Sequence, residues 1–311
     1  MIPGLAAGLF DDAAVFPPGN APLALAVRAY GGRRRVWYAG LVGPLVVPAA
    51  AVPRLGPLLP AGEPALPVSV TFPDGPAGVP AALATAAFLP VEVRSIEVAV
   101  PEGTEPDAFL ADLDAAVEDA PALDVYVEIP RDARRDKVIA AIAGRRRAKF
   151  RTGGVRAELH PGEDELAASL AAAVAAGVPF KATAGLHHAV RNTDPETGFE
   201  QHGFLNLLLA TDAILNGGTE TDARALLADR DEDRIADRVD ALGDARTAAA
   251  RAAFTSFGTC SVTEPLDELI GLGLLSAPDP GDPDRTALDP STPDDRAPHD
   301  RTSHDREDHT A

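Results

Sequence analysis

The sequence predicts a single (β/α)8 barrel, and three observations support this fold class. Eight short segments of strand character are each followed by a segment with helical periodicity, which is typical of parallel sheets with crossover helices. The chain has 311 residues, of which 46% are hydrophobic, enough for one barrel domain of about 250 residues. Closing eight parallel strands into a barrel also leaves no unpaired sheet edge.

The first four strand–helix units precede the middle of the chain. Their strands are expected at Leu9–Pro17, Val36–Val47, Pro67–Phe72 and Val93–Val100. Their helices are expected at Pro22–Tyr30, in a short segment ending near Leu59, at Val79–Leu89 and at Glu105–Glu118. The third strand alternates and the fourth helix is amphipathic, as these element types require. The first two strands are weakly defined, so an open doubly wound sheet is the alternative.

The last four units include an insertion. Their strands are expected at Leu123–Ile129, Ala148–Thr152, Phe180–Ala184 and Thr255–Cys260. Simple helices are expected at Arg134–Gly144, Glu163–Ala176 and Glu264–Leu274. Two helical segments, Gly203–Leu215 and Thr221–Phe254, lie between the seventh and eighth strands. Because this exceeds one crossover helix, we expect an inserted helical section between strands 7 and 8.

The domain boundary follows from a change in composition. The barrel is expected to span residues 1–275, and a tail residues 276–311. From Ser276 onward the chain consists largely of Asp, Pro, Arg, Thr and His with few apolar residues. Such a segment buries too little surface to order itself, so the acidic tail is predicted to be disordered. His299, His304 and His309 recur every five residues, which leaves weak metal binding as an alternative.

The charge balance restricts the class of partner. The net charge of −19 argues against nucleic acid as a partner and favours solubility. Arginines cluster at Arg33–Arg35 and Arg145–Arg147, but both clusters precede strands. We predict that they are solvated at the end of the sheet away from any active site. The expected partners are therefore small molecules, and the composition is compatible with a homo-oligomer.

Cysteine use and the amino terminus indicate the compartment. Cys260 is the only cysteine, which excludes an internal disulfide and suits a reducing compartment. The first ten residues lack the basic region and cleavage pattern of a signal peptide. No uninterrupted apolar run reaches about 18 residues, the length a membrane span needs. We expect a cytoplasmic protein without a membrane partner.

Lysine is rare, and its positions point to amine chemistry. Among 28 basic residues only Lys137, Lys149 and Lys181 are lysines, and two of these lie in the adjacent sixth and seventh strands. Arginine remains protonated, whereas a desolvated lysine, or one beside another cation, can lose its proton and attack a carbonyl. Alternatively, both lysines bind a phosphate or carboxylate.

Residues at the carboxyl ends of barrel strands share one mouth. This places Asp11, Asp12, Glu97 and Glu128 in one candidate site with the two strand lysines. Glu97 lies within an apolar strand, where an unpaired charge is costly, so a lysine across the barrel is expected to pair with it. Alternatively, Glu97 faces outward or pairs with Arg94.

Four short segments together resemble the deoxyribose-phosphate aldolase family. Lys149-Phe-Arg-Thr152-Gly153 resembles its strand-six K-x-x-T-G segment, and Lys181-Ala-Thr-Ala-Gly185 resembles its strand-seven K-x-x-G-G segment. Phe257-Gly258-Thr259-Cys260-Ser261 is similar to its last-strand segment, and Ser95-Ile96-Glu97-Val98 is a looser match to its fourth strand. The matched segments occur in the family's order and strand placement. Together they cover about 20 residues of the chain.

The resemblance implies roles for these residues. It implies Lys149 as the Schiff-base amine, Lys181 as the residue that lowers the pKa of Lys149, and Glu97 as a proton relay. It also implies that glycine-bearing loops bind a substrate phosphate. The expected substrate-binding residues are Arg151, Thr152, Gly153, Thr183, Gly185, His187, His188, Gly258, Thr259 and Ser261. The family's arginine after the strand-seven glycines is absent, and His187 and His188 stand there instead.

The remaining histidines and the cysteine leave alternatives open. His187, His188 and His202 suit acid–base work or anion binding at the mouth. Alternatively they bind a metal together with carboxylates, or His202 caps the helix that begins near it. Cys260 is expected to be a small packing residue, although a nucleophile at a helix start is the alternative.

The function predicted from the sequence is that of a class I, Schiff-base aldolase-like lyase. Its substrate is expected to be a small carbonyl compound or a phosphorylated one, and the chemistry requires neither a metal nor an organic cofactor. One alternative is a metal-dependent lyase or hydrolase using His187, His202 and carboxylates. The other is a non-catalytic phosphoanion-binding barrel.

Overall fold

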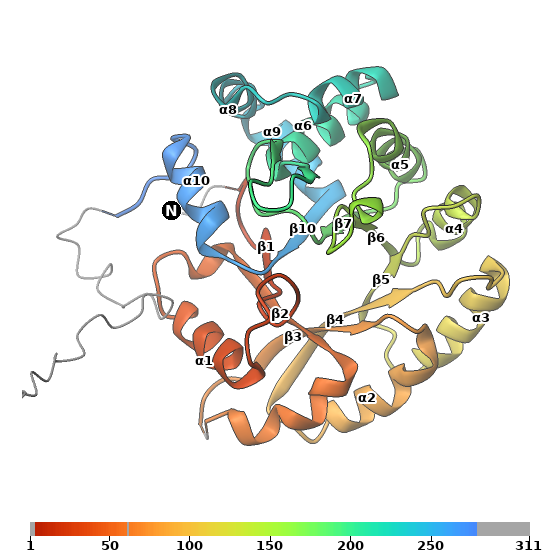
Figure 1. The fold of residues 1–311 in the computed structure, drawn as a ribbon. Helices are drawn as coiled ribbons and strands as arrows, with labels where there is room; N and C mark the ends of the chain where they lie inside the picture. The colour runs from red at the N-terminus through yellow and green to blue at the C-terminus, as the bar shows by residue number, and fades with distance from the viewer. Residues whose placement is uncertain (1–3, 61, 279–311) are drawn as a thin grey trace, which may run out of the picture.

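The computed structural model describes residues 4–60 and 62–278, and within them eight parallel strands form a closed barrel. The order around the barrel is β1-β10-β7-β6-β5-β4-β3-β2 (Figure 1). The strands are β1 (Phe10–Asp12), β2 (Val42–Pro48), β3 (Leu66–Phe72), β4 (Val91–Ala99), β5 (Asp124–Glu128), β6 (Arg147–Arg151), β7 (Phe180–Thr183) and β10 (Phe254–Thr259). The (β/α)8 prediction is confirmed, and the open-sheet alternative is wrong because β1 pairs with both β2 and β10.

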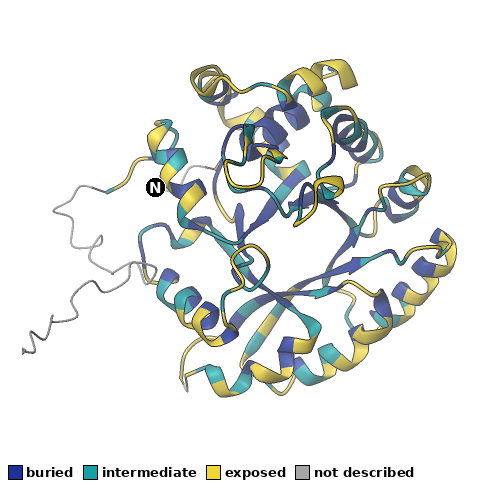
Figure 2. Cartoon of the chain, viewed as in Figure 1, coloured by how far each residue is buried: buried dark blue, intermediate teal, exposed yellow. Residues whose placement is uncertain are grey.

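Helices surround the ring of strands (Figure 1). They are α1 (Leu23–Arg33), α2 (Val79–Ala86), α3 (Pro106–Ala116), α4 (Arg135–Ile142), α5 (Glu163–Ala175) and α10 (Thr263–Gly271). Their inner faces are buried, whereas their outer faces are exposed (Figure 2). The short helix expected before Leu59 is instead a pair of 3-10 turns, Ala49–Arg54 and Gly56–Leu58. Pro53 and Pro57 lack the amide hydrogens that an α-helix needs there.

The insertion between β7 and β10 is a layered helical unit. It contains a two-stranded antiparallel sheet of β8 (Asn192–Thr193) and β9 (Glu200–Gln201). Its helices are α6 (Phe204–Leu215), α7 (Glu220–Leu227), α8 (Glu232–Asp240) and α9 (Gly243–Ala253). The predicted segment Thr221–Phe254 is thus three helices rather than one. The Asp231 side chain accepts a hydrogen bond from the Arg234 amide and thereby caps the start of α8. Gly243, with a φ of 68°, is the first residue of α9.

The helix α6 explains why the insertion is large. Nine consecutive residues of α6, from Phe204 to Asp212, are buried, so this helix is covered on all sides. It packs on β10 and is contacted by α5, α7, α8 and α9. The Phe204 ring stacks on Phe257 of β10 at 4.8 Å between ring centroids. The outer helices of the insertion and α5 therefore bury α6, and α6 in turn covers β10 on the outside of the barrel.

The predicted tail lies largely outside the described part of the chain. Residues 279–311 are not described, so the disorder expected there and the weak metal binding by its three histidines stay predictions. In residues 4–60 and 62–278, none of the helices combines the length and the apolar character required to cross a bilayer.

One arginine of the cluster Arg33–Arg35 is not solvated, contrary to the prediction. Arg33 is buried, and its guanidinium lies 2.5 Å from the carboxylate of Asp12, which is also buried. The two charges pair because Asp12 points outward from β1 toward α1, where Arg33 ends the helix. Arg35 is exposed and pairs with Glu63. Arg145–Arg147 lie at the amino end of β6, where they pair with Asp114 and Asp124.

We predict that Arg33→Ala lowers the free energy of unfolding by about 3 kcal/mol, because it leaves the buried Asp12 carboxylate unpaired. Arg34→Ala is the matched control, since the Arg34 side chain bonds only exposed backbone oxygens. It should change stability by less than about 0.5 kcal/mol. Urea denaturation followed by circular dichroism measures both, and equal losses in the two variants would contradict the assignment.

Candidate active site

The strand register explains why charged side chains converge inside the barrel. Lys149 is paired with Lys181 on one side and with Glu128 on the other. Lys181 is paired with Ser256, and Thr71 with Glu97. Side chains in register on neighbouring parallel strands point to the same face, so these residues project together into the interior. Glu97 accordingly faces inward, and Arg94 pairs with Glu92 instead.

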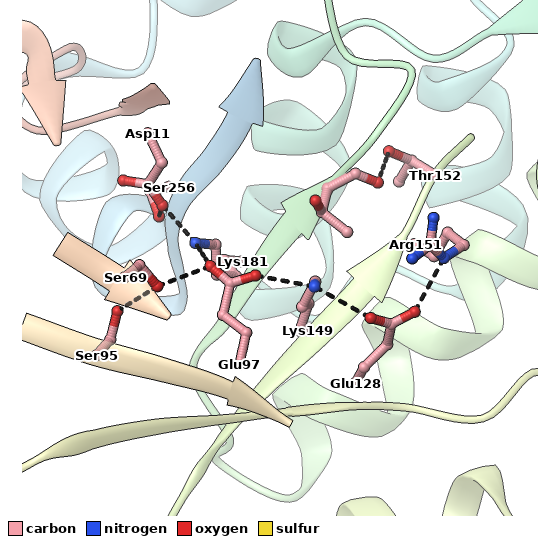
Figure 3. A network of polar contacts seen from close by, with 11 residues as sticks. Asp11, Ser69, Ser95, Glu97, Glu128, Lys149, Arg151, Thr152, Lys181 and Ser256 are labelled. Atoms are coloured by element: carbon pink, nitrogen blue, oxygen red, sulfur yellow. Dashed lines mark hydrogen bonds and ion pairs between the residues drawn. The ribbon is translucent and has the colours of Figure 1, made fainter. Parts of the chain in front are cut away.

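Glu97 links the two lysines at the centre of an ion network (Figure 3). Its Oε2 lies 2.8 Å from the Lys149 Nζ, and its Oε1 lies 2.6 Å from the Lys181 Nζ. The Ser69 hydroxyl donates to the same Oε1 at 2.9 Å and accepts from Ser95 at 2.8 Å. Both carboxylate oxygens of Glu97 are therefore bound, and its position is fixed from β3, β6 and β7.

The network extends from Glu97 in both directions. Lys181 Nζ also lies 2.5 Å from Asp11, which accepts a hydrogen bond from Ser256 at 2.8 Å. Lys149 Nζ also lies 3.0 Å from Glu128, whose other oxygen accepts from the Arg151 Nε at 2.9 Å. Three cations thus face three carboxylates, so the network is balanced when all six groups are ionised.

Burial and charge determine the protonation of these groups. Burial raises the pKa of Glu97, but Lys149 and Lys181 outweigh it and hold that pKa far below its ordinary value. Burial lowers the pKa of Lys149, yet Glu97 and Glu128 outweigh it and raise the pKa. Lys181 lowers the pKa of Lys149, as the family resemblance implied, but the two carboxylates dominate. The free protein consequently holds Lys149 as an ammonium at neutral pH.

Asp11 is the site residue that the sequence analysis left without a role. Burial raises its pKa, and Lys181 offsets this only in part. The pKa of Lys181 is itself raised, because Asp11 and Glu97 outweigh burial. The sequence did offer a signal, since Asp11 and Asp12 are consecutive in a strand and must point to opposite faces. Asp11 faces the lysines, and Asp12 faces Arg33.

A cavity of about 300 Å³ lies over the network at the carboxyl ends of the strands. Lys149, Lys181, Glu97 and Glu128 line its floor. Five of the predicted substrate-binding residues also line it, namely Arg151, Thr183, Gly185, His187 and Gly258. The arrangement therefore places two amines and two carboxylates against a space that is large enough for a small molecule.

The other predicted substrate-binding residues do not line the cavity. The Thr152 hydroxyl donates to the carbonyl of Ala184 at 2.6 Å. Gly153 approaches Gly185 so closely that an added Cβ would lie 2.9 Å from the Gly185 Cα. These two residues hold the loops after β6 and β7 together, and their assignment to substrate binding stays a prediction.

The predicted residues after β7 and β10 that lie away from the cavity bond within the protein. The His188 ring bonds Glu268 at 2.5 Å. The Thr259 hydroxyl donates to the Ser261 carbonyl at 2.8 Å, and the Ser261 hydroxyl accepts from the Glu264 amide at 3.3 Å. The polar groups of these three residues thus bond one another or α10 in this structure, and their assignment to substrate contact stays a prediction.

Cys260 and His187 meet at the rim of the cavity. The His187 Nδ1 lies 3.6 Å from the Cys260 Sγ and 3.3 Å from a Glu264 carboxylate oxygen. Burial lowers the pKa of His187, but these two neighbours outweigh it and raise the pKa to about 10. Cys260 is half-buried and lines the cavity. The loops after β7 and β10 thus bring together two residues 73 positions apart, and the packing role expected for Cys260 stays a prediction.

His202 is a buried structural residue. Its Nε2 donates to the carbonyl of Pro161 at 2.8 Å, and its Nδ1 accepts from Arg191 at 3.2 Å. These contacts differ from those of His187, so the two histidines predicted to share a metal have separate partners. Across residues 4–60 and 62–278, no group of three or more His, Cys, Asp or Glu side chains is arranged to hold a metal ion.

We predict a pH-dependent stability that originates at His202. Burial, reinforced by Arg191, lowers its pKa to about 4, whereas the unfolded value is about 6.5. The neutral imidazole therefore contributes stability above about pH 6.5, and this contribution is lost as the pH falls toward 4. The loss is about 3 kcal/mol.

The variant His202→Gln retains a donor and an acceptor without titrating, so this component of the pH dependence should vanish. Urea denaturation of both proteins between pH 4 and pH 7 measures the difference. Curves that stay parallel over this range would show that His202 does not titrate as described.

Comparisons with known proteins find a similarity of overall architecture among solved structures. Neither a protein-family model nor a curated protein matches the chain. Among solved structures, the chain is similar to one titled "QR15, an Aldolase". The sequence identity is 11% and the TM-score is 0.48, over 86% of this chain and 97% of that chain.

Proposed function

We propose that the protein is a class I aldolase-type lyase in which Lys149 forms a Schiff base with a small carbonyl compound. The observation that carries this proposal is the position of the Lys149 Nζ, at the floor of the cavity and between two carboxylates at 2.8 and 3.0 Å. An amine that can pass a proton to an adjacent carboxylate is the group that imine formation requires. The chemistry requires no metal or organic cofactor.

Lys149 is the better nucleophile of the two buried lysines. Its side chain is 7% exposed, compared with 1% for Lys181. Its neighbour Glu128 is 19% exposed and lines the cavity. Lys181 is held instead by Asp11 and Glu97, both of which are almost fully buried. A carbonyl carbon in the cavity therefore reaches Lys149 more readily, and Lys181 serves to position and neutralise Glu97.

Glu128 is suited to move the proton during imine formation. In the first step, the Lys149 ammonium transfers a proton to Glu128, the neutral amine attacks the carbonyl carbon, and a second proton moves from the nitrogen to the carbonyl oxygen to give the neutral carbinolamine. In the second step, protonated Glu128 returns that proton to the carbinolamine hydroxyl, which leaves as water. The product is an iminium cation, so the charge at Lys149 is the same before and after the reaction. Glu97, at 2.8 Å from this nitrogen, stabilises the ammonium and the iminium alike.

Carbon–carbon cleavage then follows from the electron demand of the iminium. The β-hydroxyl of the bound substrate loses its proton to a carboxylate, the Cα–Cβ bond breaks, and its electron pair forms a neutral enamine. The carboxylates of the floor can take this proton because the adjacent positive charge has disappeared. Protonation of the enamine carbon and hydrolysis of the imine release the second product.

Arg151 and His187 are the groups suited to an anionic substituent. Arg151 uses its Nε for Glu128, and its two terminal nitrogens have no bonding partner among the described residues. His187 is a cation at neutral pH because its pKa is about 10. Both line the same side of the cavity, so a carboxylate or phosphate would bind there rather than at the hydroxyls after β10.

We predict that borohydride traps a covalent adduct on Lys149 when the protein is incubated with acetaldehyde, pyruvate or dihydroxyacetone phosphate. Peptide mass analysis locates the adduct. Lys149→Arg should abolish it, because a guanidinium does not form the imine. Lys137→Arg is the matched control, since Lys137 is exposed and pairs only with Asp107.

The trapping rate should rise with pH, because deprotonation of Lys149 precedes attack. An adduct that persists in Lys149→Arg, or one found on Lys181 alone, would contradict the assignment of the nucleophile. No adduct with any of the three compounds would contradict the Schiff-base chemistry itself.

A further inference from the structure

The cavity has one wall that is almost without polar groups. This wall lies over β2, β3 and the segment after β1, opposite the lysines. Its lining residues are Phe16 and Pro17 after β1, Val46 and Pro48 on β2, and Phe72 and Pro73 at the end of β3 and just after it. The Phe72 ring itself lies on the outer face of the strand, against Gly78. Thr71 is the only polar side chain that these three segments contribute to the described lining. A ligand group on this side therefore contacts carbon almost exclusively.

The same wall is poor in backbone donors. Three of its residues are prolines, which have no amide hydrogen. A hydroxyl group placed there would lose water without gaining enough partners, which is unfavourable. Binding of a phosphate on this wall would be still less favourable, because the cations that line the described cavity all come from β6, β7 and the loop after β7. The wall does not suit a sugar or a sugar phosphate.

The rim of the cavity supports the same conclusion. Val155, in the loop after β6, is 68% exposed and lines the cavity. The other exposed large hydrophobic residues, Leu25, Phe88 and Leu215, do not line it. An apolar side chain left in solvent at the entrance is what an apolar ligand would cover.

We infer that the aldehyde that combines with the Lys149 enamine, or is released from it, carries a short apolar chain and not a polyhydroxylated or phosphorylated one. This inference rests on the proposed function. A cavity of about 300 Å³ lies at the lower end of the range for small-molecule sites, which limits the chain to a few carbons. The apolar chain lies against Val46 and Pro48, and the carbonyl group faces Lys149.

The test is an acceptor series with a fixed donor, the trapping compound that gives the largest Lys149 adduct. The acceptors are propanal, butanal, pentanal, glyceraldehyde and glyceraldehyde 3-phosphate, and product mass gives the initial rates. We expect kcat/KM to rise about fourfold per added methylene. Glyceraldehyde should be at least about tenfold poorer than butanal, which is similar in size, because of its unpartnered hydroxyls.

Two substitutions test where the preference for apolar aldehydes originates, one on the wall and one at the rim. Val46→Thr keeps the shape of the side chain and adds a hydroxyl, and it should lower the ratio of butanal to glyceraldehyde turnover about fivefold. Val155→Thr changes an exposed residue, so it tests the rim without risk to folding, and it should lower the ratio to a smaller extent. Val42→Thr is the control, because Val42 lies on the same strand outside the cavity lining; its ratio should equal that of the unmodified protein.

The outcomes separate this inference from the proposed function. Adduct formation at Lys149 with glyceraldehyde or its phosphate as the best acceptor would overturn the apolar-substrate inference and leave the Schiff-base proposal intact. A butanal preference that does not respond to Val46→Thr would overturn the assignment to this wall, whatever the response of the rim variant Val155→Thr. Absence of any Lys149 adduct would overturn both.

Discussion

The contact of Glu97 with both buried lysines is the interaction on which the site depends. An isolated ammonium in a barrel interior is strongly unfavourable, and each lysine is tolerated because a carboxylate lies within 3 Å of it. Glu97 is tolerated in the interior because both lysine ammonium groups lie within 3 Å of its carboxylate. The three charges are therefore a unit, and Asp11, Glu128 and Arg151 complete the charge balance at its two ends. Loss of Lys181 would leave Asp11 without a cation, and loss of any other member would leave the remaining buried charges unbalanced.

This balance also shapes the chemistry. The carboxylates that keep Lys149 charged oppose its action as a nucleophile, so the amine becomes available only when a proton moves to a neighbour. In the proposed reaction, the iminium restores the positive charge at the same nitrogen, and the same carboxylates then stabilise it. In our account, the network suppresses the free amine but stabilises the covalent intermediate. The charged groups of the cavity lie on β4 to β7, and the apolar wall lies on β2 and β3.

Much of this could be predicted from the sequence because the relevant signals are local. The repetition of strand segments followed by helical periodicity predicted the barrel, and the scarcity of lysine singled out Lys149 and Lys181. What escaped prediction depends on contacts between distant segments. The Arg33–Asp12 pair requires the geometry of α1 against β1. The Cys260–His187 contact joins two loops. Glu128 could be identified as a mouth residue, but its contact with Lys149 depends on the strand register.

The most direct test of the central claim is the titration of the three lysines by NMR, with 13C at the ε-carbon. The ordinary lysine pKa of about 10.4 provides the reference. The account predicts that the signals of Lys149 and Lys181 remain those of ammonium groups at every pH up to about 10.4. A signal from Lys149 that titrates near neutral pH would contradict it, since the two carboxylates would then not control the charge of that amine.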